Sequence, residues 1–340
     1  MVDIFLNRKI NFLFTVILPS YNRAAMLMSA IQSVLWQTCQ DFECVVLDDG
    51  STDDTPKLFE KFAHHQKVRW HRFPQNHGQH FCRNYAIRRS AGKFITFLDS
   101  DDVWLPTRLE EFKKAVETRP EVGFWFSNAY LWRYDRMMGT LFDPQRPIPE
   151  GKVPGYYAVG EKHLPYVTTN LAIAREAFHE VGLFRQDLRI LEDTELYARM
   201  LRQGTQVGVL RAPLAVRRLH DAQLTHDYER DFEESLVALK SGGASAHVER
   251  RYRREMALQT AVYLWKSRQP RRAREFLKKC GIPHDRQYYQ WYLLSFLPPF
   301  VLGLFRWIRK IYLKKKSKGD HGSQQFKDVE ILLQSVLVRD

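Results

Sequence analysis

Cysteine is scarce in this chain, which has four in 340 residues: Cys39, Cys44, Cys82 and Cys280. No two of them form a C-x-x-C pair, so paired-cysteine metal and redox motifs are excluded. A chain of this length can bury a sizeable core without disulfide bonds. The cysteine content therefore fits a reducing compartment.

The first residues lack the features of a signal peptide. The run M-V-D-I-F-L-N-R-K-I-N has no charged n-region, no apolar region of adequate length and no small-residue cleavage site. We therefore expect a cytoplasmic protein.

Glycine-rich phosphate-binding loops are also missing. No G-x-x-x-x-G-K-[ST] occurs, and no G-x-G-x-x-G follows a predicted strand. The first predicted strand runs into P-S-Y-N-R instead. These absences disfavour a nucleotidyltransferase with a phosphate-cradling loop and a dinucleotide-dependent oxidoreductase.

An excess of positive charge is absent from the first two thirds of the chain. The net charge is +13, but residues 1–235 carry 30 basic and 31 acidic side chains, whereas residues 236–340 carry 22 and 8. This distribution excludes a uniformly basic nucleic-acid coat protein. It indicates a tail that meets an anionic partner, either a membrane surface or a nucleic acid.

Strands and helices alternate along the first part of the chain. Short apolar runs predict strands at 12–18, 43–47, 68–73, 94–98 and 122–127. Apolar residues at helical spacing predict helices at 24–37, 55–64, 81–90, 106–118, 174–181 and 192–203. This alternation is typical of an α/β domain with a mainly parallel sheet flanked by helices.

Two other regions differ from this alternation. Residues 133–165 contain five prolines and predict an irregular excursion. From about residue 230 onward the pattern is helical throughout. We therefore predict a catalytic domain over 1–235 and a basic α-helical extension over 236–340.

Carboxylates follow the predicted strands. The second strand ends in Asp48 and Asp49, and a later one runs into Asp99, Asp101 and Asp102. Ligands of parallel sheets bind at this edge, and crowded carboxylates repel unless a cation joins them. Mn²⁺ or Mg²⁺ would suit such a site. The alternative for each single aspartate is a helix cap.

Four ordered motifs resemble glycosyltransferase family 2 over roughly residues 12–235. They read V-I-L-P-S-Y-N-R, V-V-L-D-D-G-S-T-D-D-T, N-H-G-Q-H-F-C-R-N-Y-A-I and F-I-T-F-L-D-S-D-D-V-W-L-P. The resemblance implies a GT-A (Rossmann-like) fold and an inverting enzyme that uses a nucleotide-sugar donor and a divalent metal.

The resemblance also implies a donor site. Asp49 would bind the uracil ring, with Pro19 and Tyr21 shaping the base pocket, and Arg83 would lie near the diphosphate or the base. Asp99 would contact the ribose or the metal. We also expect Arg23 near these carboxylates, on the donor side.

Two later motifs extend the resemblance. L-E-D-T-E-L-Y-A-R-M would supply Asp193 as the general base, and R-R-L-H-D-A-Q-L-T would bring His220 to the metal or the diphosphate. Asp101 would bind the metal directly. As alternatives, Asp193 is one of several first-turn acids favoured by the helix dipole, and His220 is an ordinary surface or core histidine. Asn170 and Glu192 are candidates for the acceptor side.

The basic tail contains an apolar aromatic segment. Gln287 to Phe305 is free of charge, but Pro298-Pro299 interrupts it, and seven basic residues follow at 306–318. This composition favours an interfacial element on anionic lipid over a spanning helix. The alternatives are packing on the catalytic domain and binding of nucleic acid, which we disfavour.

The sequence thus predicts a metal-dependent, inverting glycosyltransferase. It would move a sugar from a nucleotide-sugar donor, a UDP-sugar, to a hydroxyl of a glycan or lipid-linked acceptor in cell-surface polysaccharide biosynthesis. We expect it to be peripheral at the inner face of a membrane. The competing hypotheses are a non-catalytic, membrane-anchored binding protein on the same scaffold and a nucleotidyltransferase.

Overall fold

The computed structural model divides the chain into two compact units. It describes residues 12–62, 64–153, 164–220 and 227–284, together with 288, 289, 292, 293 and 296. Unit 1 is Met1–Gln223 with Ser241–Gly243, and unit 2 is Leu224–Lys240 with Ala244–Asp340. The domain boundary predicted after residue 235 falls inside helix α7 (Tyr228–Ser241), because a change in charge does not mark a change in packing.

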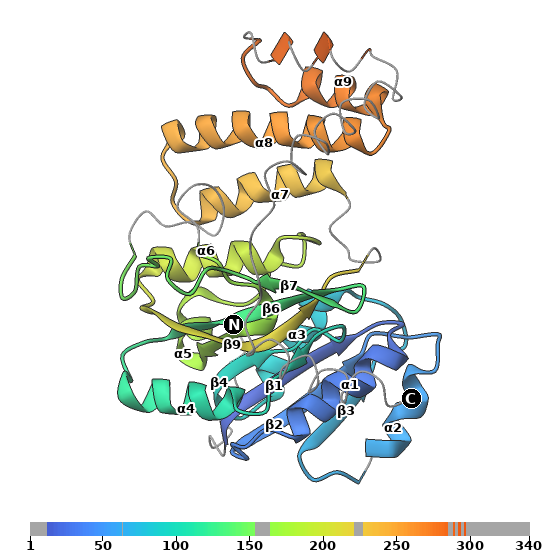
Figure 1. Cartoon of the computed structure of the whole chain (residues 1–340), viewed down its shortest axis with the longest axis vertical. Helices are drawn as coiled ribbons and strands as arrows, with labels where there is room; N and C mark the ends of the chain where they lie inside the picture. Colours follow the sequence, from blue (N-terminus) through green and yellow to red (C-terminus); the bar gives the residue numbers. More distant parts are fainter. Residues whose placement is uncertain are drawn as a thin grey trace, which may run out of the picture. The chain divides into compact units, whose positions relative to one another are not determined.

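A single mixed sheet forms the centre of unit 1 (Figure 1). Its strand order is β3-β2-β1-β4-β8-β6-β9-β5, and β7 pairs with β6. The strands are β1 (Phe12–Ser20), β2 (Phe42–Asp48), β3 (Val68–Arg72), β4 (Gly92–Phe97), β5 (Val103–Trp104), β6 (Phe124–Arg133), β7 (Arg136–Thr140), β8 (Leu171–Ala174) and β9 (Val207–Arg218). Strands β3, β2, β1 and β4 are parallel, whereas β8 is antiparallel to both of its neighbours.

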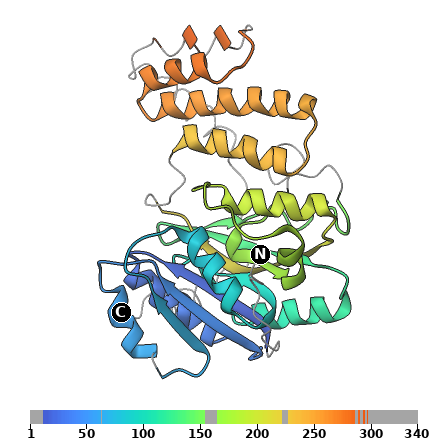
Figure 2. The same ribbon diagram turned by 180° about the vertical axis from the view of Figure 1, so that it is seen from behind.

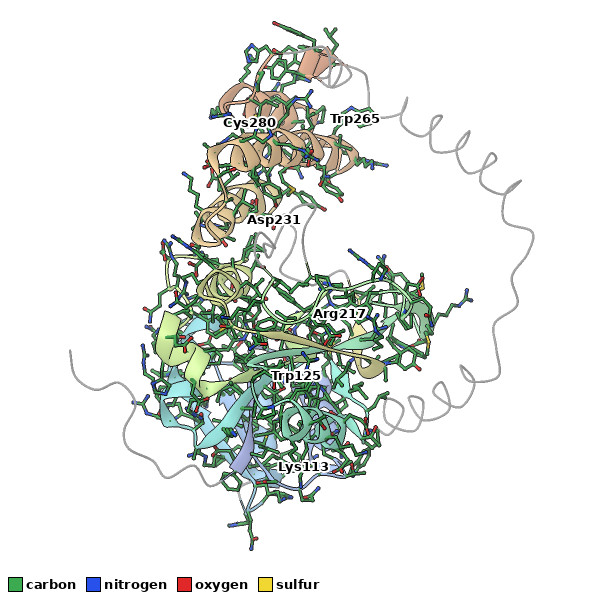
Figure 3. The ribbon with its side chains drawn as sticks, turned by 90° about the vertical axis from the view of Figure 1, so that its left-hand side faces the viewer. Lys113, Trp125, Arg217, Asp231, Trp265 and Cys280 are labelled. Carbon is green, nitrogen blue, oxygen red and sulfur yellow. The ribbon has the colours of Figure 1, made fainter. Side chains whose placement is uncertain are left out.

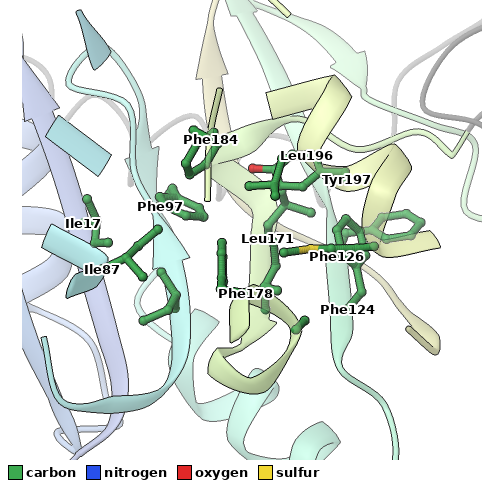
Figure 4. Packing of buried hydrophobic residues seen from close by; sticks show 14 of the residues in the cluster. Ile17, Ile87, Phe97, Phe124, Phe126, Leu171, Phe178, Phe184, Leu196 and Tyr197 are labelled. Atoms are coloured by element: carbon green, nitrogen blue, oxygen red, sulfur yellow. The ribbon is translucent and has the colours of Figure 1, made fainter. Parts of the chain in front are cut away.

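Helices cover both faces of this sheet (Figure 2). They are α1 (Ala24–Leu35), α2 (Thr55–Phe62), α3 (Gln79–Arg89), α4 (Arg108–Thr118), α5 (Arg175–Val181) and α6 (Glu192–Gln203), with a short 3₁₀ turn, η1 (Thr168–Asn170). Because side chains alternate along a strand, β1 buries Val16 with α1 and α4 and Ile17 with α3, α5 and α6. Figure 4 shows the second of these cores, where the ring of Phe97 packs edge-to-face on Phe178 and Phe184, and Phe184 packs on Tyr197. The predicted α/β fold is confirmed.

Unit 2 is helical in all its described elements. Helices α7, α8 (Ala246–Lys266) and α9 (Pro270–Lys279) carry Asp231, Trp265 and, just after α9, Cys280, which Figure 3 labels. Phe232 of α7 packs edge-to-face on Phe276 of α9, with ring centroids 5.1 Å apart. The C-terminal helical extension predicted from the sequence is therefore present in this part of the chain.

The sequence analysis did not predict strands β5, β7, β8 and β9. Strand β9 contains Gly208 and Pro213, which weaken a strand pattern, and Pro213 pairs with Asn128 where the β6–β9 register shifts. Strand β7 lies inside the segment 133–165 that we predicted to be irregular, and pairing with β6 makes it a strand. The prediction was wrong there because long-range pairing outweighed local composition. Residues 154–163 of that segment lie outside the described residues.

No helix in the described part of the chain combines the length and apolarity needed to cross a membrane. The predicted interfacial segment, Gln287 to Phe305, lies outside the described residues except at five positions, as does the whole basic run at 306–318. The prediction of an interfacial element therefore stays a prediction.

Candidate functional site

The carboxyl ends of β1, β2 and β4 lie at one edge of the sheet. In the β1–β2 ladder Ser20 is opposite Asp48, and the amide of Asp49 donates to the Ser20 carbonyl at 2.9 Å. Strand β4 continues this edge, because the Leu98 amide donates to the Ile17 carbonyl at 3.0 Å. The fold thus brings the D-D and D-S-D-D segments to one place, as the sequence predicted for parallel strands.

Asp49 and its neighbours hold the loops on the β2 side of the site. Its buried carboxylate accepts hydrogen bonds from the amides of His77 (2.8 Å) and Gly78 (2.7 Å) at the start of α3. Among the other predicted donor-side residues, Pro19 is buried in β1 and Tyr21 is 44% exposed just beyond it. Arg23 is half-buried at the N-cap position of α1. Pro19, Tyr21 and Arg23 thus lie at the end of β1 and in the connection to α1, and Asp49 lies just after β2.

Arg83 links two carboxylates in the middle of the site. Its side chain is 1% exposed, and its guanidinium donates to Asp99 Oδ1 at 2.9 Å and to Glu192 Oε1 at 3.1 Å. Burial alone would lower the pKa of Arg83, but the charges of Asp99 and Glu192 raise it above its usual value. A buried cation with two acidic partners stays charged and fixes both of them.

Asp99 and Glu192 are both harder to ionise than free carboxyls. Burial raises the pKa of Asp99, and the charges of Asp101 and Asp193 add to this, whereas Arg83 opposes it. Burial also raises the pKa of Glu192 to about 8, with a further contribution from Asp193. Such perturbed carboxyls cluster at functional sites.

The Glu192 carboxyl predicts a pH-dependent stability. Folding raises its pKa from 4.5 to about 8, so between these values the folded chain keeps a proton that the unfolded chain has lost. The contribution of this group to the free energy of unfolding therefore falls as the pH rises from 5 to 8, by on the order of several kcal/mol. The glutamine of Glu192→Gln cannot titrate. From pH 5 to pH 8 we therefore expect the melting temperature of this variant to rise relative to that of the wild type. If the melting temperatures of the wild type and the variant changed equally between pH 5 and pH 8, the raised pKa of Glu192 would be contradicted.

Asp193 lies in the first turn of α6, next to Glu192. Its Oδ2 accepts a hydrogen bond of 2.6 Å from the Thr168 hydroxyl, and its Oδ1 accepts from the amide of Thr194, also at 2.6 Å. The negative charge of Asp193 adds to the effect of burial in raising the pKa of Tyr166. Asp193 is therefore half-buried, held by hydrogen bonds, and close to the group formed by Arg83, Asp99 and Glu192, which we call the Arg83 network.

Asp101 and His220 meet where β9 ends. The distance from His220 Nε2 to Asp101 Oδ2 is 2.9 Å, and both side chains are 19% exposed. Their approach is fixed by Asp102, which accepts a hydrogen bond from the Arg218 amide at 2.9 Å, and by the Arg218 side chain, which donates to the Asp101 carbonyl. Burial, with the charges of Asp101 and Asp99, raises the pKa of Asp102 well above its usual value.

Asp101 and His220 fit a metal ion that is shared with a ligand. Within the described residues, no group of three or more His, Cys, Asp and Glu is arranged to hold a metal by itself. An octahedral ion with bonds of about 2.1 Å places adjacent ligand atoms about 3 Å apart, which matches the Asp101–His220 separation. Mg²⁺ and similar ions complete such incomplete protein shells with phosphate oxygens and water.

Known proteins resemble this chain in both sequence and fold. The family model described as Glycosyl transferase family 2 matches residues 15–182, which include helix α3 with Arg83 and the strand ends that carry Asp49, Asp99 and Asp101. The chain carries a glycosyl transferase family 2 domain. The resemblance predicted from the motifs is therefore confirmed.

This chain matches only part of the length of its family 2 relatives. An uncharacterized glycosyltransferase of Rickettsia felis (strain ATCC VR-1525 / URRWXCal2) is 40% identical over 196 residues, 57% of this chain and 31% of the relative. The Escherichia coli protein UDP-Glc:alpha-D-GlcNAc-diphosphoundecaprenol beta-1,3-glucosyltransferase WfgD is 31% identical over 137 residues, 40% of this chain and 53% of the relative. The chain thus spans about a third to a half of the length of these relatives.

A solved structure shares the fold of the family 2 domain. The mannosyltransferase PcManGT from Pyrobaculum calidifontis, in complex with GDP-Man and Mn²⁺, is 16% identical, with a TM-score of 0.54 over 85% of each chain. At this identity the likeness shows the fold alone, which is GT-A.

The structure places two predicted acceptor-side residues in supporting positions. Asn170 is fully buried, and its side-chain amide accepts from the Val167 amide at 3.0 Å and donates to the Ser127 carbonyl. Glu192 is fully buried against Arg83. Both side chains therefore have partners within the family 2 domain, and their predicted acceptor role has no contact that favours it.

Sequence reasoning missed Thr168 and Arg218, which hold Asp193 and the Asp101–Asp102 loop. Arg218 stands two residues before His220, so the R-R-L-H motif carried a signal for it. Thr168 stands in T-T-N, which carries no local signal, since its role depends on contact with a helix 25 residues away.

Proposed function

We propose that this protein is an inverting, metal-dependent glycosyltransferase that uses a nucleotide-sugar donor. The observation that carries the proposal is the chain of contacts from Asp99 through Arg83 to Glu192, next to Asp193. It joins the strand-end carboxylates, where a donor would bind, to a carboxylate on a separate helix that faces the same site. One side serves the leaving group and the other serves the attacking hydroxyl.

Asp193 acts as the general base in this proposal. The acceptor hydroxyl attacks the anomeric carbon from the face opposite the nucleotide, and its proton passes to a carboxylate oxygen of Asp193. The bond from the anomeric carbon to the diphosphate oxygen breaks, and its electron pair stays on the diphosphate. Attack from the opposite face inverts the anomeric centre. A positioned base contributes about 10²–10⁴-fold to such a step.

The leaving diphosphate gains negative charge, which must be stabilised. Asp101 and His220 would hold a divalent ion, Mn²⁺ or Mg²⁺, and this ion supplies positive charge to the phosphate oxygens. Asp49, Pro19, Tyr21 and Arg23 would bind the nucleoside. Arg83 fixes Asp99 at the junction between these groups and the base side.

The relatives suggest a donor and an acceptor. The name of the Escherichia coli protein WfgD specifies UDP-glucose as donor and a sugar-diphosphate-undecaprenol as acceptor. We propose a UDP-sugar and a lipid-linked glycan acceptor for this chain too, in the assembly of a cell-surface polysaccharide. UDP-glucose is the first donor to test.

A panel of nucleotide sugars with Mn²⁺ tests the proposal by thermal shift. A ligand that binds only the folded state raises the melting temperature. At a ligand concentration of 100 Kd it adds about 2.7 kcal/mol to the free energy of unfolding. We expect one UDP-sugar to stabilise the chain in the presence of the metal and to be slowly hydrolysed. Binding without any hydrolysis would favour the alternative of a non-catalytic binding protein, and no binding by any nucleotide sugar would refute the proposal.

We also propose peripheral association with the inner face of a membrane. Helix α9 supports this, because it buries Ala273, Phe276 and Leu277 and exposes four basic side chains: Arg271, Arg272, Lys278 and Lys279. Basic side chains near an anionic surface contribute about 1 kcal/mol each. Sedimentation with vesicles containing anionic lipid tests this, and full-length protein wholly in the supernatant at low salt would contradict it.

A further inference from the structure

Thr168 connects Asp193 to a second element of the fold. The Thr168 hydroxyl donates to Asp193 Oδ2 at 2.6 Å, while the bonds to Oδ1 come from Thr194, the next residue in the same helix. The bond from η1 therefore restrains the carboxylate relative to the sheet, which the bonds within α6 cannot do.

The η1 turn that carries Thr168 is held from both sides. The Trp104 indole donates to the Thr169 carbonyl at 3.0 Å, and the Arg108 guanidinium donates to the Thr169 and Leu171 carbonyls at 3.3 and 2.9 Å. Asn170 ties the same turn to the Val167 amide at 3.0 Å and to the Ser127 carbonyl. The position of the Thr168 hydroxyl is thus fixed by several independent contacts.

Arg108 is a costly group to place there. It is fully buried, it stacks on Trp104 (3.8 Å to the ring centroid) and Phe112 (4.5 Å), and its hydrogen bonds go to neutral oxygens. Burial lowers its pKa well below its usual value. A buried charge with no carboxylate among these partners lowers stability. Its use to hold one carbonyl of η1 and the first carbonyl of β8 indicates that the place of this turn matters.

The surroundings of Asp193 make a hydrogen-bond donor valuable. Five ionisable groups interact with its charge: Arg83 of α3, Asp99 after β4, Tyr166 before η1, and Glu192 and Tyr197 of α6. Asp99 and Glu192 repel a carboxylate when they are charged, and the two phenol oxygens are buried. The Thr168 hydroxyl offsets this repulsion at the oxygen that it contacts.

We infer that Thr168 is a positioning residue for Asp193: its hydroxyl, held by the clamped η1 turn, keeps one carboxylate oxygen oriented so that it can take the acceptor proton. This inference rests on the proposed function. Thr168 touches neither donor nor acceptor in this role, because it acts through Asp193.

The neighbouring residue provides a matched control. Thr169 is also fully buried, but its hydroxyl has no hydrogen-bond partner within the described residues. Thr168→Val and Thr169→Val therefore make the same exchange of hydroxyl for methyl one residue apart. Thr168→Ser keeps the hydroxyl and serves as the rescue variant.

The first measurement is the metal-dependent hydrolysis of the UDP-sugar that stabilises the full-length chain most. We expect Thr168→Val to lower kcat by about 10- to 100-fold with little change in the donor KM. Thr168→Ser should restore most of the rate, and Thr169→Val should match the wild type.

The second measurement is thermal unfolding, which needs no activity. We expect Thr168→Val to melt below Thr169→Val, because it loses a hydrogen bond to Asp193 that the Thr169 hydroxyl does not make. Equal rates and equal melting of the two valine variants would overturn the inference, even if Asp193→Asn is inactive. Wild-type hydrolysis by Asp193→Asn would instead refute the proposed base and the positioning role with it.

Discussion

Asp193→Asn is expected to lose sugar transfer by about 10²–10⁴-fold while it still binds the donor. Asparagine keeps the shape of aspartate and can still accept the hydrogen bond from Thr168, so the first turn of α6 should persist. What it lacks is an oxygen basic enough to take the proton of the acceptor hydroxyl. The measurement is kcat for donor consumption, together with the thermal shift that the donor and Mn²⁺ produce.

A matched control for this variant is Asp187→Asn. Asp187 is an exposed aspartate in the loop before α6 that pairs with Arg185 at 2.5 Å, outside the contacts described for the site. We expect it to transfer sugar at the wild-type rate. Transfer by Asp193→Asn at the parent rate would show that another group takes the proton.

Asp101→Asn is expected to abolish the effect of the metal on both donor binding and turnover. The change removes the charge of one of the two side chains proposed to hold the ion, and His220 alone is a weak site for a hard cation. We expect donor consumption to fall by about 10²–10³-fold, which is typical for the loss of one group that stabilises a leaving anion. Titration of Mn²⁺ at fixed donor concentration measures the change.

The control for Asp101→Asn is Asp135→Asn, at the exposed turn between β6 and β7. This variant makes the same change of net charge and should keep the metal dependence of the wild type. If Asp101→Asn responded to Mn²⁺ with the wild-type midpoint, the ion would have to bind elsewhere, and the assignment of Asp101 and His220 would fail.

The parallel half of the fold was predictable because its signals are local. Strands β1, β2 and β4 are apolar runs that end directly in Pro19-Ser20, Asp48-Asp49 and Leu98-Asp99, so sequence order alone places these side chains at one edge. The other half was not predictable in this way. Strand β8 has four residues, and β9 contains Pro213 opposite a register shift, so both depend on partners far away in the chain.

The same distinction holds for the site. The roles of Asp101, Asp193 and His220 were proposed from motifs, and the structure places Asp101 against His220 and Asp193 near the Arg83 network. The motifs did not reveal that Arg83 is fully buried between two acids, nor that Asn170 and Glu192 are occupied by contacts within the chain. Those facts depend on which helix packs on which strand end, and a linear pattern does not contain this information.

The end of β9 couples the integrity of the sheet to ligand binding. The last pairs of the β6–β9 ladder run to Trp132 and Arg218, and the Leu219 amide donates to the Trp132 carbonyl at 2.7 Å, one residue before His220. Fraying of this strand end would therefore withdraw His220 from Asp101. By thermodynamic linkage, a ligand that needs both residues must suppress that fraying. An occupied site therefore stabilises the last residue pairs of the β6–β9 ladder.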